Sequence, residues 1–185
     1  KSILDVATGT GDFAFEAIKI LKPGQVTGVD ISEGMLDVAR KKIRERNLEQ
    51  IFTVHSGDSE KLNFPDNSFD AITVAFGVRN YQDLEAGLSE MFRVLSPGGM
   101  IVILEFSKPR RFPIKQLYNM YFTYLTPFFG KLFSKDKRAY SYLTESVEAF
   151  PDRENFTGLM NKVGYTHTKY ESLTFGISSI YTGVK

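Results

Sequence analysis

The stretch DVATGTGD, residues 5–12, joins a predicted strand to a predicted helix. The apolar run Ser2–Val6 has the length and composition of a buried strand. Apolar residues after the stretch recur at helical spacing as far as Pro23, which ends the helix. Glycines at such a junction let the backbone turn sharply and approach a ligand beside the helix N-terminus. We therefore expect a ligand at this turn.

The same alternation of strands and helices continues along the chain. Further strands are predicted at 25–31, 51–55, 69–76, 100–106, 165–170 and 175–184, and helices at 32–46, 84–95 and 153–163. Strands that alternate with helices indicate a parallel sheet with right-handed crossovers. The expected fold is α/β, with seven strands in a mostly parallel sheet and helices on both of its faces.

Aromatic residues gather between the fifth strand and the last helix. The helical stripe consists of Ile114, Leu117, Tyr118, Tyr121, Phe122 and Leu125, and it resumes at 128–133 after Pro127. A more polar stretch at 134–138 follows. We expect one domain over residues 1–185, with an aromatic helical insertion or lid at about 109–150. Such a stripe can line a ligand groove or pack against the core, and both roles stay open.

Composition excludes several classes of function. The absence of cysteine removes disulfides, thiolate catalysis and zinc-thiolate sites, and His55 and His167 lie far apart, so no metal site is expected. A net charge of +1 gives no electrostatic case for a nucleic-acid partner. Apolar runs are too short for a membrane-spanning helix, and no signal peptide opens the chain. A cytoplasmic protein is expected.

Acidic residues follow or lie within three of the predicted strands. Asp5 precedes Gly9 by four residues, where a pyrophosphate would not favour a carboxylate but an ammonium and a sulfonium would. Asp30 closes the second strand and can accept hydrogen bonds from ribose hydroxyls, while Asp58 and Ser59 can meet an adenine amino group. Carboxyl ends of parallel strands meet at one sheet edge. The set therefore favours S-adenosylmethionine (SAM).

An NAD-dependent oxidoreductase is the alternative from the same residues. The spacing Gly9-x-Gly11-x-x-Ala14 fits a dinucleotide fingerprint, and Asp30 serves either cofactor. Against it stand Asp5 and the lack of a Tyr-x-x-x-Lys pair after the fourth strand. Asp30 and Asp58 also have ordinary uses in helix caps and turns.

Longer segments narrow the interpretation to a family. The order of Asp5, the glycine turn, Asp30 and Asp58 resembles class I SAM-dependent methyltransferases. The segments FGVRN at 76–80, RVLSPGGMIVILEFS at 93–107 and YSYLTESV at 140–147 resemble the ubiquinone/menaquinone biosynthesis C-methyltransferases, and the resemblance covers essentially the whole chain.

The resemblance implies a Rossmann-like class I methyltransferase fold and SAM as the cofactor. It places Thr10, Asp30, Asp58 and Ser59 at the SAM contacts, and we add Asp5, Gly9 and Gly11 from the turn. The implied reaction methylates a ring carbon of a lipophilic polyprenyl quinol, converting demethylmenaquinol to menaquinol. Family members carry an upstream segment with a His-x-x-Trp motif that this chain lacks, so we expect an N-terminally truncated domain.

Two residues after the fourth strand are the candidate catalytic groups. A phenol titrates near 10, and a neighbouring cation lowers that pKa and concentrates charge on the attacking carbon. Arg79 is the candidate cation and Asn80 a hydrogen-bond donor beside it. The alternative for Arg79 is an ion pair with a neighbouring element.

A greasy substrate requires an apolar groove, and Tyr118, Tyr121 and Phe122 are its candidate lining. Lys108, Arg110 and Arg111 precede the stripe and either meet anionic lipid or form an ordinary solvated charge cluster. Peripheral membrane contact at the inner face and a homodimer are further partner predictions. Two other functions remain: methylation of another phenolic or sterol-like molecule, and a non-catalytic SAM-binding subunit of a quinone-synthesis complex.

Overall fold

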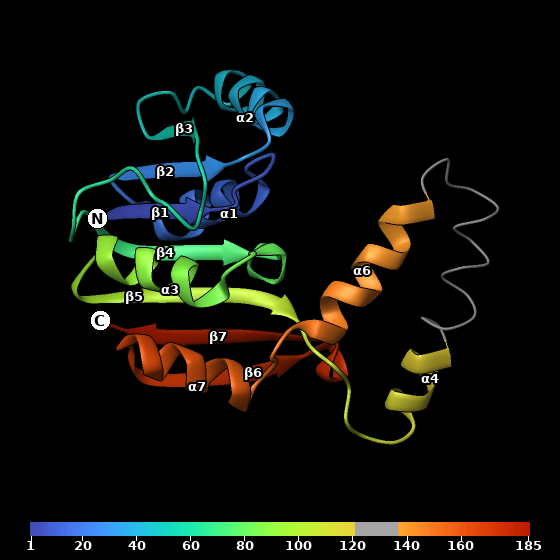
Figure 1. Cartoon of the computed structure of the whole chain (residues 1–185). Helices are drawn as coiled ribbons and strands as arrows, with labels where there is room; N and C mark the ends of the chain where they lie inside the picture. The colour runs from blue at the N-terminus through green and yellow to red at the C-terminus, as the bar shows by residue number, and fades with distance from the viewer. Residues whose placement is uncertain (121–136) are drawn as a thin grey trace.

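A computed structural model describes residues 1–120 and 137–185 of the chain. Its seven strands form one sheet in the order β3-β2-β1-β4-β5-β7-β6 (Figure 1). Strands β1 to β5 pair in parallel, and β7 pairs antiparallel with both β5 and β6. The strands are β1 (Ser2–Val6), β2 (Gln25–Asp30), β3 (Phe52–Ser56), β4 (Phe69–Ala75), β5 (Leu95–Phe106), β6 (Thr166–Leu173) and β7 (Ser178–Val184).

Helices cover both faces of the sheet, because neighbouring strand residues point to opposite faces. Ile3 packs with Phe15 and Ile18 of the first helix, whereas Leu4 belongs to the larger cluster that includes residues of the third and last helices. Figure 1 shows α3 and α7 together in front of the sheet. These helices are α1 (Asp12–Leu21), α2 (Glu33–Glu45), α3 (Leu84–Val94) and α7 (Glu154–Val163).

The structure confirms the expected α/β class, and its differences from the predictions lie at element ends. β5 begins at Leu95 rather than residue 100, because Leu95 pairs with Phe69 before a register shift in that ladder. The last strand begins at Ser178 rather than residue 175. A short turn, η3 (Thr174–Gly176), occupies the difference, and its Thr174 and Phe175 have left-handed φ values of 48° and 58°.

Within residues 107–120 and 137–153, the described parts of the expected insertion and its flanks, two helices follow β5. They are α4 (Ile114–Met120) and α6 (Lys137–Ala149), and both lie beyond the end of β5 (Figure 1). Helix α6 begins at Lys137, inside the polar stretch at 134–138. Ser146, Val147 and Phe150 are buried, at the spacing that turns one face of this helix inward. None of the described helices has the length and apolar character needed to span a bilayer.

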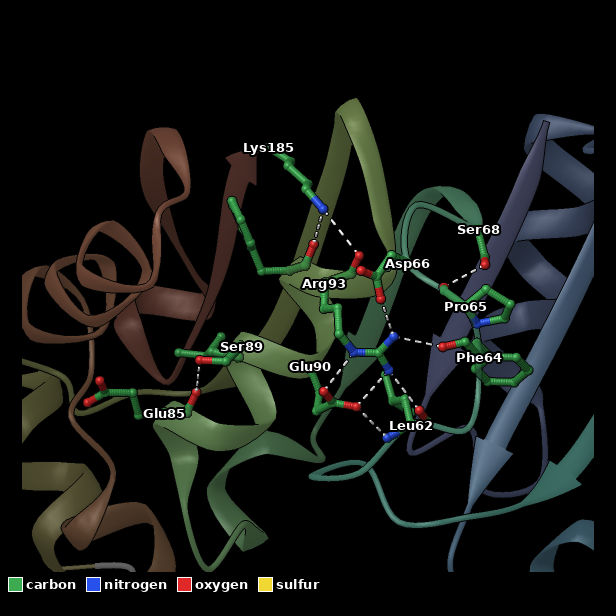
Figure 2. Close-up of polar contacts among 12 residues, drawn as sticks. Leu62, Phe64, Pro65, Asp66, Ser68, Glu85, Ser89, Glu90, Arg93 and Lys185 are labelled. Atoms are coloured by element: carbon green, nitrogen blue, oxygen red, sulfur yellow. Dashed lines mark hydrogen bonds and ion pairs between the residues drawn. The ribbon is translucent and has the colours of Figure 1, made fainter.

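The guanidinium of Arg93 fixes the segment between β3 and β4 (Figure 2). It donates to the carbonyls of Leu62 and Phe64, each at 2.8 Å, and to the carboxylates of Asp66 and Glu90. Glu90 in turn accepts a bond from the Leu62 amide at 2.9 Å. This segment starts with the residues that enter the cavity described next, so Arg93 holds its far half in place.

Candidate functional site

A cavity of about 810 Å³ opens at the carboxyl edge of β1, β2 and β4. Its walls come from the turns that follow those strands and from the segment that follows β3. Residues expected to bind a cofactor line it, namely Asp5, Gly9, Thr10, Asp30, Asp58 and Ser59. Gly11 is not among the lining residues and is the N-cap of α1. Six of the seven residues predicted to contact a cofactor therefore lie around one cavity.

Two glycines are required by the shape of this edge. Gly11 is the N-cap of α1 at φ +80°, a conformation that side chains rarely adopt. Gly77 follows β4, and a Cβ there would lie 2.5 Å from the Cβ of Ala7. The turns after β1 and β4 can therefore approach closely only with glycine at position 77.

Asp30 organises the turn after β1. Its Oδ2 accepts the Gly9 amide at 2.8 Å, and its Oδ1 accepts the Ser32 amide at 2.8 Å. Each carboxylate oxygen has a second lone pair, so both can still accept a hydroxyl proton. The side chain thus shapes the turn and offers acceptors to the cavity, which suits a ribose diol.

Asp5 is buried in β1, with 1% of the residue exposed. Its two oxygens accept bonds from the hydroxyls of Thr8 and Thr73, each at 2.6 Å. Burial raises the pKa of Asp5 to about 6, and these bonds only partly offset that effect. A cationic group in the cavity would stabilise the ionised form.

The remaining predicted contacts are ordered by their own neighbours. The Thr10 hydroxyl donates to Asp12 at 2.6 Å, and Lys42 holds that carboxylate from α2 at 2.7 Å. Asp58 accepts the amide of Glu60 at 2.8 Å, an ordinary turn contact. Glu60 accepts the amides of Gln82 and Asp83, so it joins the segment after β3 to the turn after β4.

Arg79 lies in the short helix η1 (Val78–Asn80), and the structure gives it an ion pair. Its Nη1 lies 2.9 Å from Oε1 of Glu105, which is fully buried at the end of β5. The same nitrogen donates to the carbonyl of Phe76 at 2.5 Å. Burial raises the pKa of Glu105, and the adjacent Arg79 opposes that rise. The alternative of an ion pair with a neighbouring element is therefore confirmed, and Arg79 is not among the cavity-lining residues.

Asn80 does line the cavity, and it connects the cavity to the insertion. The Tyr142 hydroxyl of α6 donates to Oδ1 of Asn80 at 3.0 Å. Because that bond uses the oxygen, the amide nitrogen of Asn80 keeps its two donors for other partners. Tyr142 lies in the segment YSYLTESV at 140–147, but its position at this site was not predicted, because only the packing of α6 onto η1 brings it here.

Several lining residues were missed by sequence reasoning. Phe76 and Tyr81 border the cavity on the β4 side, and Ile31 and Met35 border it beside Asp30. Ile31 is 79% exposed directly after a buried strand, which is a signal for an apolar ligand surface. Burial raises the pKa of Tyr81, whose hydroxyl lies beside Ser59.

The predicted substrate residues are only partly described. Tyr118 lies on α4, is half-buried and is not among the residues that line this cavity; burial raises its pKa to about 12. Tyr121 and Phe122 lie outside the described residues.

The cavity fits an adenosyl cofactor with an amino-acid tail. Its volume falls in the range of roughly 300–1,000 Å³ that small-molecule sites have. Asp30 offers acceptors for a diol, Asp5 offers a negative charge, and Ile31 and Met35 offer apolar surface. No group of three or more metal-ligating side chains occurs in the described part of the chain.

Comparisons with known proteins agree with this geometry. The model of the ubiE/COQ5 methyltransferase family matches residues 1–185. A demethylmenaquinone methyltransferase of Bacteroides fragilis is 49% identical over 185 residues, which is all of this chain and 76% of that protein. The ubiquinone/menaquinone biosynthesis C-methyltransferase UbiE of Geobacter sulfurreducens is 47% identical over 99% of this chain and 72% of its own length.

Solved structures support the fold. A phosphoethanolamine N-methyltransferase of Haemonchus contortus, in complex with S-adenosylhomocysteine, superposes with a TM-score of 0.74 at 18% identity, over 100% of this chain and 48% of that one. A possible histamine N-methyltransferase of Thermotoga maritima gives 0.68 at 22% identity, over 100% and 82%. The family model and the relatives at 47–49% identity decide against the NAD-dependent alternative: the chain belongs to the ubiE/COQ5 methyltransferase family and is a class I enzyme that uses SAM.

Proposed function

We propose that this enzyme methylates a ring carbon of a polyprenyl quinol and converts demethylmenaquinol into menaquinol. The proposal is supported by the activities named for its relatives in Bacteroides fragilis and Geobacter sulfurreducens. The observation that carries it is the bond of 3.0 Å between Tyr142 and Asn80. That bond joins the insertion to the cavity, so a substrate held by the insertion can reach the cofactor.

We assign the cofactor to the residues at the carboxyl edge of the sheet. Bound SAM supplies a methyl group on a sulfonium sulfur. Asp30 accepts the ribose hydroxyls and keeps the Gly9 amide in place. Asp5 provides negative charge for the ammonium, and its raised pKa falls when that cation is present. The proposed set is Asp5, Gly9, Thr10, Gly11, Asp30, Asp58 and Ser59.

The transfer itself requires orientation and an electron-rich ring. The ring carbon forms the new bond to the methyl group, the carbon–sulfur bond breaks, and the ring proton leaves to a base. Asn80 donates its amide protons to the ring oxygen, because its own oxygen is occupied by Tyr142. This donor stabilises the negative charge that the oxygen acquires.

In this proposal Arg79 acts indirectly, by positioning the backbone that carries Asn80. Its charge is largely offset by Glu105 at 2.9 Å, and the pair fixes the backbone of η1. The Glu105 carboxylate accepts the Arg79 amide at 3.3 Å, next to Asn80 in sequence. A direct contact of the guanidinium with the quinol oxygen stays a prediction, as does the role of Tyr118, Tyr121 and Phe122 in the substrate groove.

The test is methyl transfer measured by mass spectrometry. The protein is incubated with SAM carrying a deuterated methyl group and with demethylmenaquinol, and the extracted quinones are analysed. We expect labelled menaquinol, and we expect Asn80→Ala to lose turnover while calorimetry shows unchanged SAM affinity. A demethylated benzoquinol and a phenol without a prenyl tail serve as competing substrates.

Other results of this labelling experiment would support a different substrate or function. Labelling of the benzoquinol alone would overturn the naphthoquinol assignment. Equal labelling of the tail-less phenol would favour a methyltransferase for small phenolic molecules. SAM binding with no product from any acceptor would favour a non-catalytic subunit.

A polyprenyl quinol resides in a bilayer, so we also propose that the enzyme contacts a membrane peripherally from the cytoplasm.

A further inference from the structure

A second cavity, of about 740 Å³, lies between the start of the insertion and the η3 turn. Arg110, Arg111, Phe112 and Phe175 are among its lining residues. Ser178 of β7 pairs with Phe106 at the end of β5, so η3 lies at the carboxyl edge of β5. This second cavity therefore opens at the same sheet edge as the cofactor cavity.

Large apolar side chains are exposed around it. Phe112 is 80% exposed and Phe175 is 78% exposed. Helix α4 adds Leu117 and Met120, which are 53% and 49% exposed. Scattered exposed apolar residues are ordinary, but two exposed phenylalanines that line one hollow, with further exposed apolar side chains on the helix that follows, mark an interaction surface.

The backbone at Phe175 argues that its exposure is not incidental. Phe175 has φ +58° and its neighbour Thr174 has φ +48°, both in the left-handed region that bulky and branched residues avoid. A buried side chain could offset such strain by packing, but this one is 78% exposed. The stability of the fold therefore does not account for phenylalanine at this position.

The charges around the hollow are mainly positive. Arg110 is paired with Glu154 at 3.1 Å and with Asp152 at 3.8 Å. Arg111 and Lys115 are exposed, and neither has an ion-pair partner within residues 1–120 and 137–185. Arg111 thus lines the hollow together with both exposed rings, and Lys115 follows one turn further along, where its amide donates to the Arg111 carbonyl.

We propose that this surface docks on a bilayer that contains anionic phospholipids. The docking surface consists of Phe112, Leu117, Met120 and Phe175 with Arg111 and Lys115. Aromatic and aliphatic side chains enter the headgroup boundary, and nearby cations are attracted to the negative lipid surface. Docking there turns the carboxyl edge of the sheet, with the cofactor cavity, toward the layer where a polyprenyl quinol resides. The proposal deepens the proposed function and rests on it for the choice of a bilayer as partner.

The absence of tryptophan from the chain allows a direct test. In Phe175→Trp the single indole reports its own environment. With vesicles of equal parts phosphatidylcholine and phosphatidylglycerol, we expect its emission to shift to the blue and to be quenched by brominated acyl chains. Ile20→Trp is the matched control. Ile20 is 71% exposed near the C-terminal end of α1, whereas the N-terminal end of that helix lies at the carboxyl edge of the sheet. Its emission should not change.

Vesicle sedimentation measures the energetic contribution. We expect Phe112→Ser with Phe175→Asn, and separately Arg111→Glu, to weaken binding by at least about tenfold. Asparagine suits position 175 because it tolerates the left-handed conformation. The controls Ile20→Ser and Arg44→Glu, on α1 and α2, should bind vesicles as the parent does. Calorimetric SAM affinity equal to that of the parent shows that each variant is folded.

Three results would overturn the proposal. One is vesicle binding without a blue shift at position 175, which would place the contact elsewhere. Another is equal binding to pure phosphatidylcholine, which would remove the anionic partner. The third is a dimer that Phe175→Asn disrupts in a protein that ignores vesicles, which would make a second copy the occupant. These measurements need no quinol and no turnover, so their failure is distinct from failure of the substrate proposal.

Discussion

The arginines at the two edges of the sheet differ in how many of their hydrogen-bond donors are used. At the amino edge, Arg93 donates to two carbonyls and two carboxylates, and Lys185 beside it donates to three acceptors (Figure 2). At the carboxyl edge, Arg79 keeps a buried Nε without a hydrogen bond among the described residues, and Asp30 and Asn80 keep unused capacity. An edge whose polar groups are fully used serves as scaffold, whereas spare donors and acceptors mark the edge that receives ligands.

The largest expected effect tests whether Arg79 belongs to the scaffold or to the site. Arg79→Ala leaves Glu105 charged and buried, which should lower the free energy of unfolding by about 3–5 kcal/mol in chemical denaturation. Adding Glu105→Gln removes the unpaired charge and should restore most of that stability. The double variant then separates the two roles, because SAM affinity and turnover can be measured on a folded protein.

The turnover of that double variant distinguishes the two roles of Arg79. If turnover recovers together with stability, Arg79 acts only by holding η1. If stability returns and turnover stays low, the guanidinium contacts the quinol oxygen. Arg93→Ala is the matched control at the other edge: it should also destabilise the protein, but turnover per folded molecule should change little because Arg93 does not line the cavity.

The buried carboxylate of Asp5 is expected to lower the stability of the fold at neutral pH while it supports cofactor binding. Its pKa of about 6 lies above the usual value of 3.8, so the folded state holds the proton more tightly than the unfolded state. Stability from this group is present below pH 4 and is lost as the pH rises through 6, by about 3 kcal/mol at most. Asp5→Asn should therefore raise the melting temperature at pH 7.5, since one threonine hydroxyl can keep donating to the amide oxygen while the other turns to accept from the amide nitrogen.

The same variant should bind SAM more weakly, because the negative charge facing the ammonium is gone. Stability is followed between pH 4 and 8 in the variant and the parent, and the difference should grow across pH 4–6. A pH-independent difference would show that Asp5 is not the titrating group. Unchanged SAM affinity would show that its charge does not reach the cofactor.

Asp30→Ala should weaken SAM binding at least about tenfold by calorimetry. The substitution removes the ribose acceptors and also releases the amides of Gly9 and Ser32. Asp37→Ala on the exposed face of α2 is the control and should leave affinity unchanged, because Asp37 pairs with Arg40 and is not among the cavity-lining residues. Equal affinity in both variants would remove Asp30 from the cofactor site.

Local sequence patterns were sufficient for the fold and for the sheet edge at which the larger cavity opens. Alternation at period two and at helical period sets the strands and helices, and the parallel topology then brings Gly9, Asp30 and Asp58 to one edge. The register of β4 against β5 sets the pairing of Arg79 with Glu105, 26 residues away, and no local pattern carries that register. The η3 turn was read as strand because Phe175 adopts a φ that its residue type avoids.

The contact between Tyr142 and Asn80 also depends on tertiary packing, and it gives the smallest and most specific prediction. Tyr142→Phe removes one hydroxyl from a residue that is 54% exposed, so stability should change little. Asn80 can then turn its amide, and turnover should fall a few-fold to about tenfold while SAM affinity is unchanged. Tyr170→Phe is the control, since it loses a comparable bond of 2.6 Å to Glu154 away from the cavity. Equal loss in both variants would show that Tyr142 has no specific part in orienting Asn80.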